Sequence, residues 1–510
     1  MSGSAEAKRA IVIVGGGTAG WMAAAALSRF LPPDRTVTLV ESEEIGTIGV
    51  GESTIPQMTV FNQGLGIDEA EFVRATSGSY KLGIEFVDWL RPGHSYFHGF
   101  GSIGREVGIV PFHHFWLRSR ALGNLAEMWA YSPNALAARD GRFGHPTAGD
   151  GPARQAFGYA YHIDAIAYAR FLRGFAERGG VARVEGRVVD VVRDPESGDI
   201  AALRLADGRE LSGELFFDCS GFVSLLLGQT LGVPFEDWTH WLPCDRAWAA
   251  PSATEGEAVP FTRAIARRAG WQWRIPLQHR MGNGIVYCSG FVDDDEARET
   301  LIGSIDGELL ADPRPLRFTT GRRARLWEGN CIALGLAGGF LEPLEATSIY
   351  MVQSGIARAL RYFPGARIDP ADRAAYNAES EFEYAAVRDF LILHYHANQR
   401  LGDPFWDERR TMAIPASLAR KLALFQASGR IFRENLELFD VPSWLQVMWG
   451  QGLRPKSYNP LADRVPEPDL RAMLDETAAA SRKLAGRLPS LAEFLAASGA
   501  AIPREAQPVR

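Results

Sequence analysis

The chain has 510 residues, of which 54 are Lys or Arg and 61 are Asp or Glu, so its formal net charge is −7. Apolar residues make up 46% and charged residues 23% of the sequence, which is ordinary globular usage and excludes a disordered or collagen-like chain. The acidic balance argues against a broad nucleic-acid or anionic-membrane surface, because such surfaces need clustered positive charge. At about 150 residues per domain, the length predicts two to four folding units.

Cysteine usage and the N-terminal segment indicate where the protein works. The four cysteines are far apart and form no C-x-x-C pair, which excludes a zinc ribbon and a disulfide scaffold and favours a reducing compartment. The apolar stretch 10–27 imitates a signal peptide or a short membrane span, but Gly15-Gly16-Gly17 interrupts it. We therefore expect a cytoplasmic protein with neither a membrane nor a nucleic acid as partner.

The N-terminal segment predicts a β-α-β unit. Residues 11–14 form a short β-branched run ahead of the glycines, which is typical of a buried parallel strand. Residues 20–30 are rich in alanine and are followed by two prolines, which predicts a helix with a stop signal. Residues 37–40 predict a second strand. Such a unit implies a right-handed crossover and therefore a parallel sheet.

Strands and then helices are predicted further along the chain. Strand-like runs occur at 183–192, 203–205, 214–217 and 331–334. Apolar residues then recur at spacings of three and four over 345–363, which is one face of an amphipathic helix. More helices are predicted at 373–393, 415–425 and 477–488, and at Ser490, where Ser490 and Glu493 have capping-box spacing.

These elements predict an α/β protein in which a mostly helical module wraps a Rossmann-like nucleotide-binding core. We expect the core to comprise residues 1–110 and 155–365. Residues 111–154 would form an excursion to the substrate side, and residues 366–510 would form the helical substrate-side module.

Gly15-x-Gly17-x-x-Gly20 predicts a dinucleotide site, because it directly follows a strand and opens a helix. In such a turn Gly15 permits the tight bend, Gly17 lets the backbone approach a pyrophosphate, and Gly20 lets helix and strand pack closely. The helix N-terminus presents free N–H groups and a partial positive charge to the phosphates. Glu41, at the end of the second strand, can accept hydrogen bonds from both ribose hydroxyls.

The segment 329–339 favours FAD over NAD. It has the pattern of a late strand, a glycine-rich turn and a long helix, which would bring a second helix N-terminus beside an anionic reduced flavin ring. An ordinary strand-to-helix connection has the same pattern. No second G-x-G-x-x-G follows a strand, so no separate nicotinamide domain is evident. The predicted cofactor contacts are Gly15, Gly17, Thr18, Ala19, Gly20, Glu41, Val50, Gly335 and Leu336.

Several segments together resemble the flavin-dependent tryptophan halogenases, up to about Leu436. They are Gly15-x-Gly17-x-x-Gly20, Gly49-Val50-Gly51-Glu52-Ser53-Thr54-Ile55-Pro56, Tyr80-Lys81-Leu82-Gly83, Asp218-Cys219-Ser220-Gly221-Phe222, Gly270-Trp271-Gln272-Trp273-Arg274-Ile275-Pro276 and Phe340-Leu341-Glu342-Pro343-Leu344-Glu345-Ala346-Thr347. The W-x-W-x-I-P element is the most specific of them, because it separates the halogenases from their hydroxylating flavoenzyme relatives.

The resemblance implies an enzyme that uses reduced FAD, oxygen and chloride or bromide to make hypohalous acid, which halogenates an aromatic ring. It implies that Lys81 captures and aims this acid, by a hydrogen bond from its ammonium group or as a haloamine. It implies that Glu345 stabilises the cationic ring intermediate and accepts the lost proton. We expect opposite charges to keep both residues ionised. We also expect Glu345 in the first turn of a helix, where the macrodipole favours a carboxylate regardless of function.

The resemblance places the halide on backbone N–H groups at Thr347 and Ser348. Family members commonly have glycine where this chain has Ser348, which leaves the preference for chloride or bromide open. The resemblance also implies that the element with Trp271, Trp273, Ile275 and Pro276 separates the flavin from the substrate. Packing in the core would equally explain the two tryptophans.

On the substrate side, His98 and Phe100 match the pair that stacks on the indole ring in the family. The segment 430–444 looks shortened relative to the segment that holds the amino-acid backbone in tryptophan-specific members. A simpler indole or another electron-rich aromatic, held by stacking, is therefore the expected substrate. Trp444 and Trp449 are candidate walls of its pocket.

The resemblance further implies a separate flavin reductase as partner and a homodimer. The alternative is a single-component FAD-dependent aromatic hydroxylase, against which the W-x-W-x-I-P element argues. A non-catalytic flavin-binding protein would need neither Lys81 nor Glu345. His113-His114 and His394-x-His396 lack a third ligand at a recognisable spacing, so we expect no metal site.

Overall fold

The computed structural model describes residues 9–44, 51–106, 108–147, 149–150 and 154–502. The predicted cofactor contact Val50 lies outside the described residues. Among the described helices, none has both the length and the apolar character needed to cross a bilayer.

A six-stranded sheet carries the predicted β-α-β unit. Its strand order is β20-β21-β12-β1-β2-β8, and all of its pairs are parallel except β20 with β21. The strands are β1 (Arg9–Val14), β2 (Arg35–Glu41), β8 (Ala182–Glu185), β12 (Leu215–Asp218), β20 (Trp327–Glu328) and β21 (Cys331–Ala333). Helix α1 (Thr18–Phe30) connects β1 to β2. The Rossmann-like α/β core is therefore confirmed.

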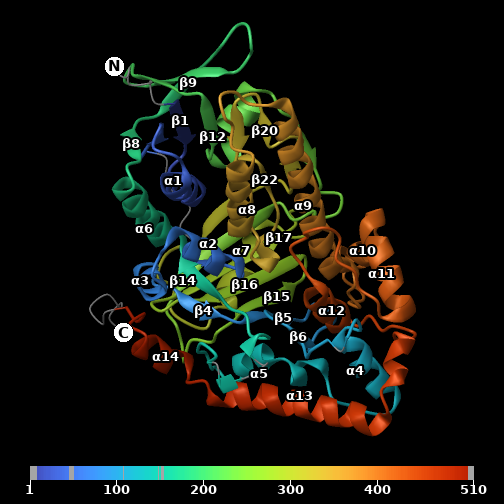
Figure 1. The fold of residues 1–510 in the computed structure, drawn as a ribbon. Helices are drawn as coiled ribbons and strands as arrows, with labels where there is room; N and C mark the ends of the chain where they lie inside the picture. Colours follow the sequence, from blue (N-terminus) through green and yellow to red (C-terminus); the bar gives the residue numbers. More distant parts are fainter. Residues whose placement is uncertain (1–8, 45–50, 107, 148, 151–153, 503–510) are drawn as a thin grey trace, which may run out of the picture.

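A seven-stranded sheet lies below the six-stranded one in Figure 1. Its order is β18-β14-β17-β16-β15-β5-β6, and only β5 and β15 pair in parallel. The strands are β5 (Gly83–Val87), β6 (Ser95–Gly99), β14 (Arg246–Ser252), β15 (Thr262–Arg267), β16 (Gly270–Pro276), β17 (Met281–Tyr287) and β18 (Arg314–Arg317). The W-x-W-x-I-P element is strand β16, which lies in the middle of this sheet.

Three small sheets complete the strands. Their orders are β3-β7-β4, β11-β10-β9 and β13-β19-β22. The strands are β3 (Gly51–Ser53), β4 (Ser79–Lys81), β7 (Ala160–Asp164), β9 (Val188–Arg193), β10 (Ile200–Leu205), β11 (Glu210–Ser212), β13 (Phe235–Asp237), β19 (Gly321–Arg323) and β22 (Gly339–Phe340). The first of these sheets carries Lys81 at the end of β4.

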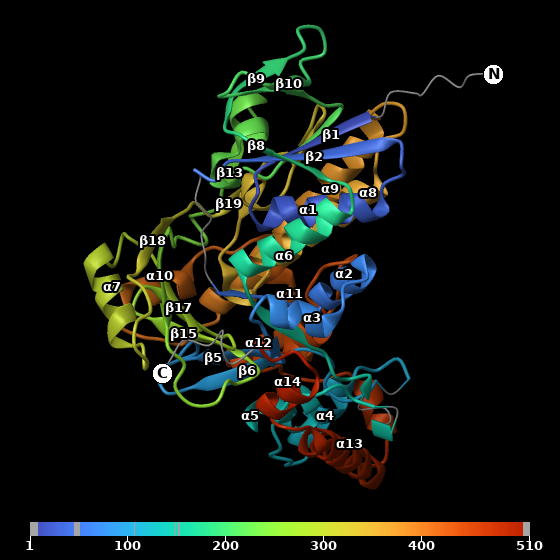
Figure 2. The same ribbon diagram turned by 90° about the vertical axis from the view of Figure 1, so that its left-hand side faces the viewer.

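Helices surround the sheets on several sides (Figures 1 and 2). They are α2 (Gln57–Leu65), α3 (Glu69–Ala75), α4 (Phe112–Ala121), α5 (Pro133–Arg139), α6 (Ala165–Arg178), α7 (Asp294–Gly303), α8 (Ser348–Arg361), α9 (Pro370–His396), α10 (Pro404–Thr411), α11 (Ala416–Ser428), α12 (Val441–Gly450), α13 (Glu467–Arg487) and α14 (Leu491–Ala497). Helix α13 packs against α4 and α5, so the segment 111–154 lies beside the C-terminal helices.

The long helix α9 joins the two large sheets. Near its start, Asn377 accepts hydrogen bonds from the backbone N–H groups of Leu326 and Trp327, beside β20. Near its end, the ring of His394 lies against Phe86 of β5, at 4.8 Å between ring centres. The end of α9 therefore has a fixed position relative to both sheets, and so do the side chains that it carries.

Three elements differ from the sequence-based prediction. The run 183–192 is two strands, because the chain leaves the six-stranded sheet at Gly186 and then pairs with β10. The helix predicted over 345–363 begins only at Ser348, because Ala346 has a φ of +58°, which a right-handed helix does not allow. Helix α13 begins at Glu467, ten residues before the predicted start at 477.

The turn after β21 also differs from the prediction. Gly335–Ala337 is one 3-10 turn, and strand β22 and a second 3-10 turn follow it before α8 begins. The strand therefore does not run directly into a long helix, as the pattern over 329–339 had indicated. The capping box at Ser490 and Glu493 is present as predicted.

Candidate active site

A cavity of about 920 Å³ opens at the carboxyl ends of the parallel strands. Ligands bind at this edge in open α/β sheets, and the volume is near the upper end of the range for ligand pockets. Its lining includes the glycine turn 15–19, Glu41, the turn at Gly335 and Leu336, and the start of α8. The two segments predicted to bind the cofactor thus face the same cavity.

The three glycines of the turn serve different purposes. Gly15 has a φ of +109°, and a Cβ atom there would overlap the carbonyl group of Cys219. A Cβ atom on Gly20 would overlap the carbonyl oxygen of Gly15. A Cβ atom on Gly17 would instead have no described atom within 4 Å, so the protein leaves space there. This open cradle at a helix N-terminus fits the pyrophosphate of a dinucleotide.

Glu41 lies over the glycine turn, where its carboxyl group occupies the space that a side chain on Gly16 would need. It forms an ion pair with Arg183 of β8. Across the cavity Gly335 has a φ of +62°, and a Cβ atom there would be 3.0 Å from that of Ala19. Both turns therefore approach each other closely.

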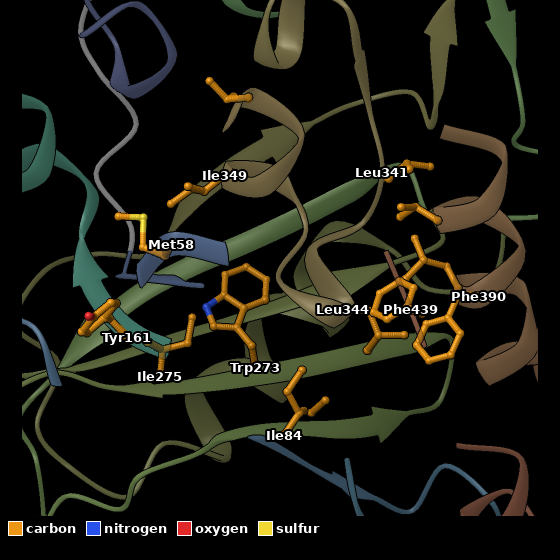
Figure 3. Packing of buried hydrophobic residues seen from close by; sticks show 14 of the residues in the cluster. Met58, Ile84, Tyr161, Trp273, Ile275, Leu341, Leu344, Ile349, Phe390 and Phe439 are labelled. Atoms are coloured by element: carbon orange, nitrogen blue, oxygen red, sulfur yellow. The ribbon is translucent and has the colours of Figure 1, made fainter. Parts of the chain in front are cut away.

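The tryptophans of β16 form one wall of the cavity, together with Ile275. Trp273 crosses over Gly284 of β17, which is its cross-strand neighbour. In Figure 3, Trp273 and Ile275 stand side by side on the sheet. Pro276 accepts a hydrogen bond from the Ser79 hydroxyl at 2.6 Å, next to the strand that carries Lys81.

Glu342 fixes the other tryptophan. Trp271 Nε1 donates to Glu342 Oε2 at 2.9 Å, and the Tyr395 hydroxyl donates to the same oxygen at 2.6 Å. Burial raises the pKa of Glu342 to about 7, against the lowering effect of these two hydrogen bonds. Its Oε1 atom has no hydrogen-bonding partner among the described residues.

Lys81 is fully buried at the end of β4. Its Nζ donates to the carbonyl oxygen of Thr54 at 3.0 Å and lies 5.0 Å from the ring centre of Phe100. Burial lowers the pKa of Lys81 from 10.5 to about 7, while the charge of Glu345 raises it. Among the described residues no carboxylate forms an ion pair with Nζ, so the direct pairing that we expected with Glu345 is absent.

Two histidines contact Glu345 instead. His98 Nδ1 lies 2.9 and 3.0 Å from the two carboxylate oxygens, and His394 Nε2 lies 2.8 Å from Oε1. All three side chains are almost completely buried. Burial raises the pKa of Glu345, but the charges and hydrogen bonds of the histidines lower it to about 2. The carboxylate is therefore ionised because of the histidines and not because of a helix start, since α8 begins three residues later.

Aromatic side chains surround His98. Phe390 and Phe439 are stacked on each other at 3.8 Å between ring centres, and these centres lie 5.8 and 6.4 Å from that of His98. Trp444 packs edge-on against Phe390 at 4.9 Å. Figure 3 shows Phe390 and Phe439 together beside Leu344.

Of the two tryptophans on α12, only Trp444 reaches this group. Trp449 packs against Trp116 of α4 at 4.5 Å, and its Nε1 donates to Glu127 at 3.2 Å. Phe100 packs with Ile55, on the side of Lys81. His98 and Phe100 therefore contact different partners, Glu345 and Lys81.

Thr347 and Ser348 line the large cavity at the start of α8. The first N–H groups of a helix have no partner within it, so they can bind an anion. The hydroxyl of Thr347 is buried without a hydrogen-bonding partner among the described residues. The two residues predicted to hold the halide thus have the polar groups that an anion needs.

Sequence reasoning missed His394, which it considered only as a metal ligand together with His396. Its contact with Glu345 joins residues 49 positions apart, and no local spacing reveals it. It also missed Glu342, although this residue lies within the segment 340–347 that carried the resemblance. A second buried carboxyl three residues before Glu345 was the available signal.

The fold and these contacts define a dinucleotide-binding α/β protein with a second, buried polar centre around Glu345. The chain matches the tryptophan halogenase family over residues 10–467 and belongs to it. The tryptophan 6-halogenase SttH of Streptomyces toxytricini is 35% identical over 519 residues, which cover 96% of this chain and 98% of that protein.

Solved structures agree with this assignment. A flavin-dependent halogenase from Xanthomonas campestris is 48% identical, with a TM-score of 0.94 over 99% of this chain and 100% of that one. A flavin-dependent halogenase from Brevundimonas sp. BAL3 is 43% identical, with a TM-score of 0.93 over 98% of this chain and 100% of that one. This protein is an FAD-dependent halogenase of aromatic rings, and the hydroxylase alternative is not favoured.

The glycine turn yields a first prediction. Gly20→Ala should lower both the stability of the protein and its affinity for FAD, because the new methyl group overlaps the Gly15 carbonyl. Gly17→Ala should weaken FAD binding while the stability without FAD stays unchanged. Urea unfolding and FAD titration followed by flavin fluorescence measure the two effects. If both substitutions lowered the free energy of unfolding equally in the absence of FAD, the interpretation that Gly17 leaves space for the pyrophosphate would be wrong.

A second prediction concerns the buried lysine. The lowered pKa of Lys81 corresponds to a cost of roughly 5 kcal/mol for holding the ammonium in the folded state. This cost is fully present below pH 7 and disappears as the pH rises towards 10.5, since the unfolded chain then also loses the proton. Lys81→Met should therefore raise the free energy of unfolding most at pH 6 and progressively less up to pH 10. Urea titrations across this range measure it, with the exposed Lys483→Met as control.

Proposed function

We propose that the enzyme receives reduced FAD from a separate flavin reductase and halogenates an indole or another electron-rich aromatic. When bound in the large cavity, reduced FAD supplies hypohalous acid from oxygen and chloride or bromide. The buried amine of Lys81 carries this proposal, because it lies outside the lining of the large cavity and has no carboxylate paired to it among the described residues.

Lys81 captures the hypohalous acid and aims it at the substrate. A pKa near 7 means that both the ammonium and the free amine are present at neutral pH. The ammonium can hydrogen-bond the hypohalous oxygen, and the free amine can form a haloamine. Either form turns a diffusible oxidant into one with a fixed position.

Glu345 supplies the negative charge that the cationic ring intermediate and its leaving proton require. Its lowered pKa keeps the carboxylate ionised throughout the working pH range. Thr347 and Ser348 hold the halide on the flavin side, and Trp271, Trp273, Ile275 and Pro276 keep the substrate away from the flavin.

The residues around His98 favour a small aromatic substrate over a free amino acid. Phe390, Phe439 and Trp444 offer ring faces and edges for stacking. Glu437, in the shortened segment, is buried in an ion pair with Lys421 at 2.8 Å, so its charge is already neutralised. The relative SttH is a tryptophan 6-halogenase, whereas we propose indole itself as the simplest substrate of this chain. We also propose a homodimer, on the basis of the family alone.

One assay tests the proposal. The enzyme is supplied with reduced FAD, oxygen, bromide or chloride, and a panel of indoles, and mass spectrometry detects the isotope pattern of a halogenated product. Lys81→Ala should abolish halogenation while FAD oxidation continues, because hypohalous acid still forms but is not captured. Hydroxylated products, or no halogenation of any electron-rich aromatic, would refute the proposed function.

The halide site gives a separate prediction. Thr347→Val removes the unpartnered hydroxyl while it preserves the shape of the side chain. A lost hydrogen bond to an ion should raise the KM for bromide by roughly tenfold. The KM for the indole should stay unchanged in the same steady-state assay. An unchanged bromide KM would show that the backbone N–H groups alone bind the halide.

A further inference from the structure

Both oxygens of the Glu345 carboxylate are already engaged by histidines. His98 Nδ1 lies within 3.0 Å of each oxygen, and His394 Nε2 lies 2.8 Å from Oε1. The carboxylate is buried to 1% exposure, so no bulk water competes for it. A proton that went to Glu345 directly would weaken these contacts, because they favour the ionised carboxylate.

The two ring nitrogens of His394 both lie close to oxygen atoms. Its Nδ1 lies 2.8 Å from the carbonyl oxygen of Phe390, which can only accept a hydrogen bond. Its Nε2 faces Glu345 Oε1, which also only accepts when the carboxylate is ionised. His394 therefore places the end of α9 against the Glu345 carboxylate.

His98 has only one nitrogen engaged. Its Nδ1–H donates to Glu345, so whenever the ring is neutral its lone pair lies on Nε2. No described residue forms a hydrogen bond with this Nε2. The rings of Phe390 and Phe439, which we propose to contact the aromatic substrate, have their centres 5.8 and 6.4 Å from that of the His98 ring.

A carboxylate that hydrogen-bonds one imidazole nitrogen turns the other into an effective base. The carboxylate fixes the tautomer and stabilises the imidazolium that forms, without taking the proton itself. In this site Glu345 would have that role for His98, and His394 would hold Glu345 in place from the opposite side.

We propose that Nε2 of His98 accepts the proton lost by the ring during halogenation, and that Glu345 and His394 are positioning residues for this step. The C–H bond at the halogenated carbon breaks, its electron pair restores the aromatic ring, and the proton forms an N–H bond on Nε2. The imidazolium is neutralised by Glu345 and releases the proton to water when the product leaves. The inference rests on the proposed function.

The test compares the turnover of indole with that of indole deuterated at its ring carbons, in separate reactions. In the unaltered enzyme the two rates should be equal, because loss of the proton is fast. In His98→Gln, kcat should fall by about 100-fold or more, and the deuterated substrate should react more slowly still, because proton loss has become limiting. FAD oxidation should continue at its normal rate.

Four further variants distinguish a role of His98 as the base from a role in packing alone. His113→Gln changes another buried histidine, on α4, and should leave both rates unchanged. His394→Phe should produce the isotope effect, and His394→Gln, which can still donate to Glu345, should show a smaller one. When imidazole is added, His98→Ala should regain turnover and lose its isotope effect. This rescue keeps the proposal testable even if the His98→Gln variant does not fold.

The outcomes distinguish this inference from the proposed function. If the unaltered enzyme halogenates no aromatic, both are wrong. If it is active and His98→Gln is slow but shows no isotope effect, His98 only stacks on the substrate and the inference alone is wrong. The same conclusion would follow if imidazole failed to rescue a folded, FAD-binding His98→Ala variant.

Discussion

The buried carboxylate of Glu345, held between two histidines, is the contact on which the catalytic centre depends. Its three residues come from strand β6, from the turn before α8 and from the end of α9, so the contact joins the seven-stranded sheet to segments that pack on the other one. An isolated carboxylate at this depth would take up a proton. The histidines keep it ionised, and this charge in turn faces Lys81.

The backbone around Ala346 separates the large cavity from the contact of Glu345 with the histidines. Ala346 has a left-handed φ of +58°, which is strained for a residue with a side chain. Glu345, just before it, contacts the histidines, whereas Thr347, just after it, lines the large cavity. Residues two apart can therefore serve the halide and the substrate. In the function that we propose, this turn and the tryptophans of β16 would together separate the two reactions.

Two buried polar side chains of the site lower the free energy of unfolding. Lys81 is buried without an ion pair among the described residues, and Glu342 keeps an unpartnered oxygen behind Trp271. An apolar residue of the same size in place of Lys81 would raise the free energy of unfolding, since a buried charge without an ion pair lowers it. Such groups are expected where an enzyme needs an amine of lowered pKa or a precisely held indole ring.

The sequence by itself determined the α/β class, the β-α-β unit and the dinucleotide turn, because strands, helices and glycine turns depend on residues close together in the chain. It also identified Lys81 and Glu345, through short segments shared with a family. Only the tertiary structure decided how these residues are charged. The contact of Glu345 with His98 and His394 spans 247 and 49 positions, and it depends on where α9 ends relative to β6. Long-range packing sets that relation, and no local pattern encodes it.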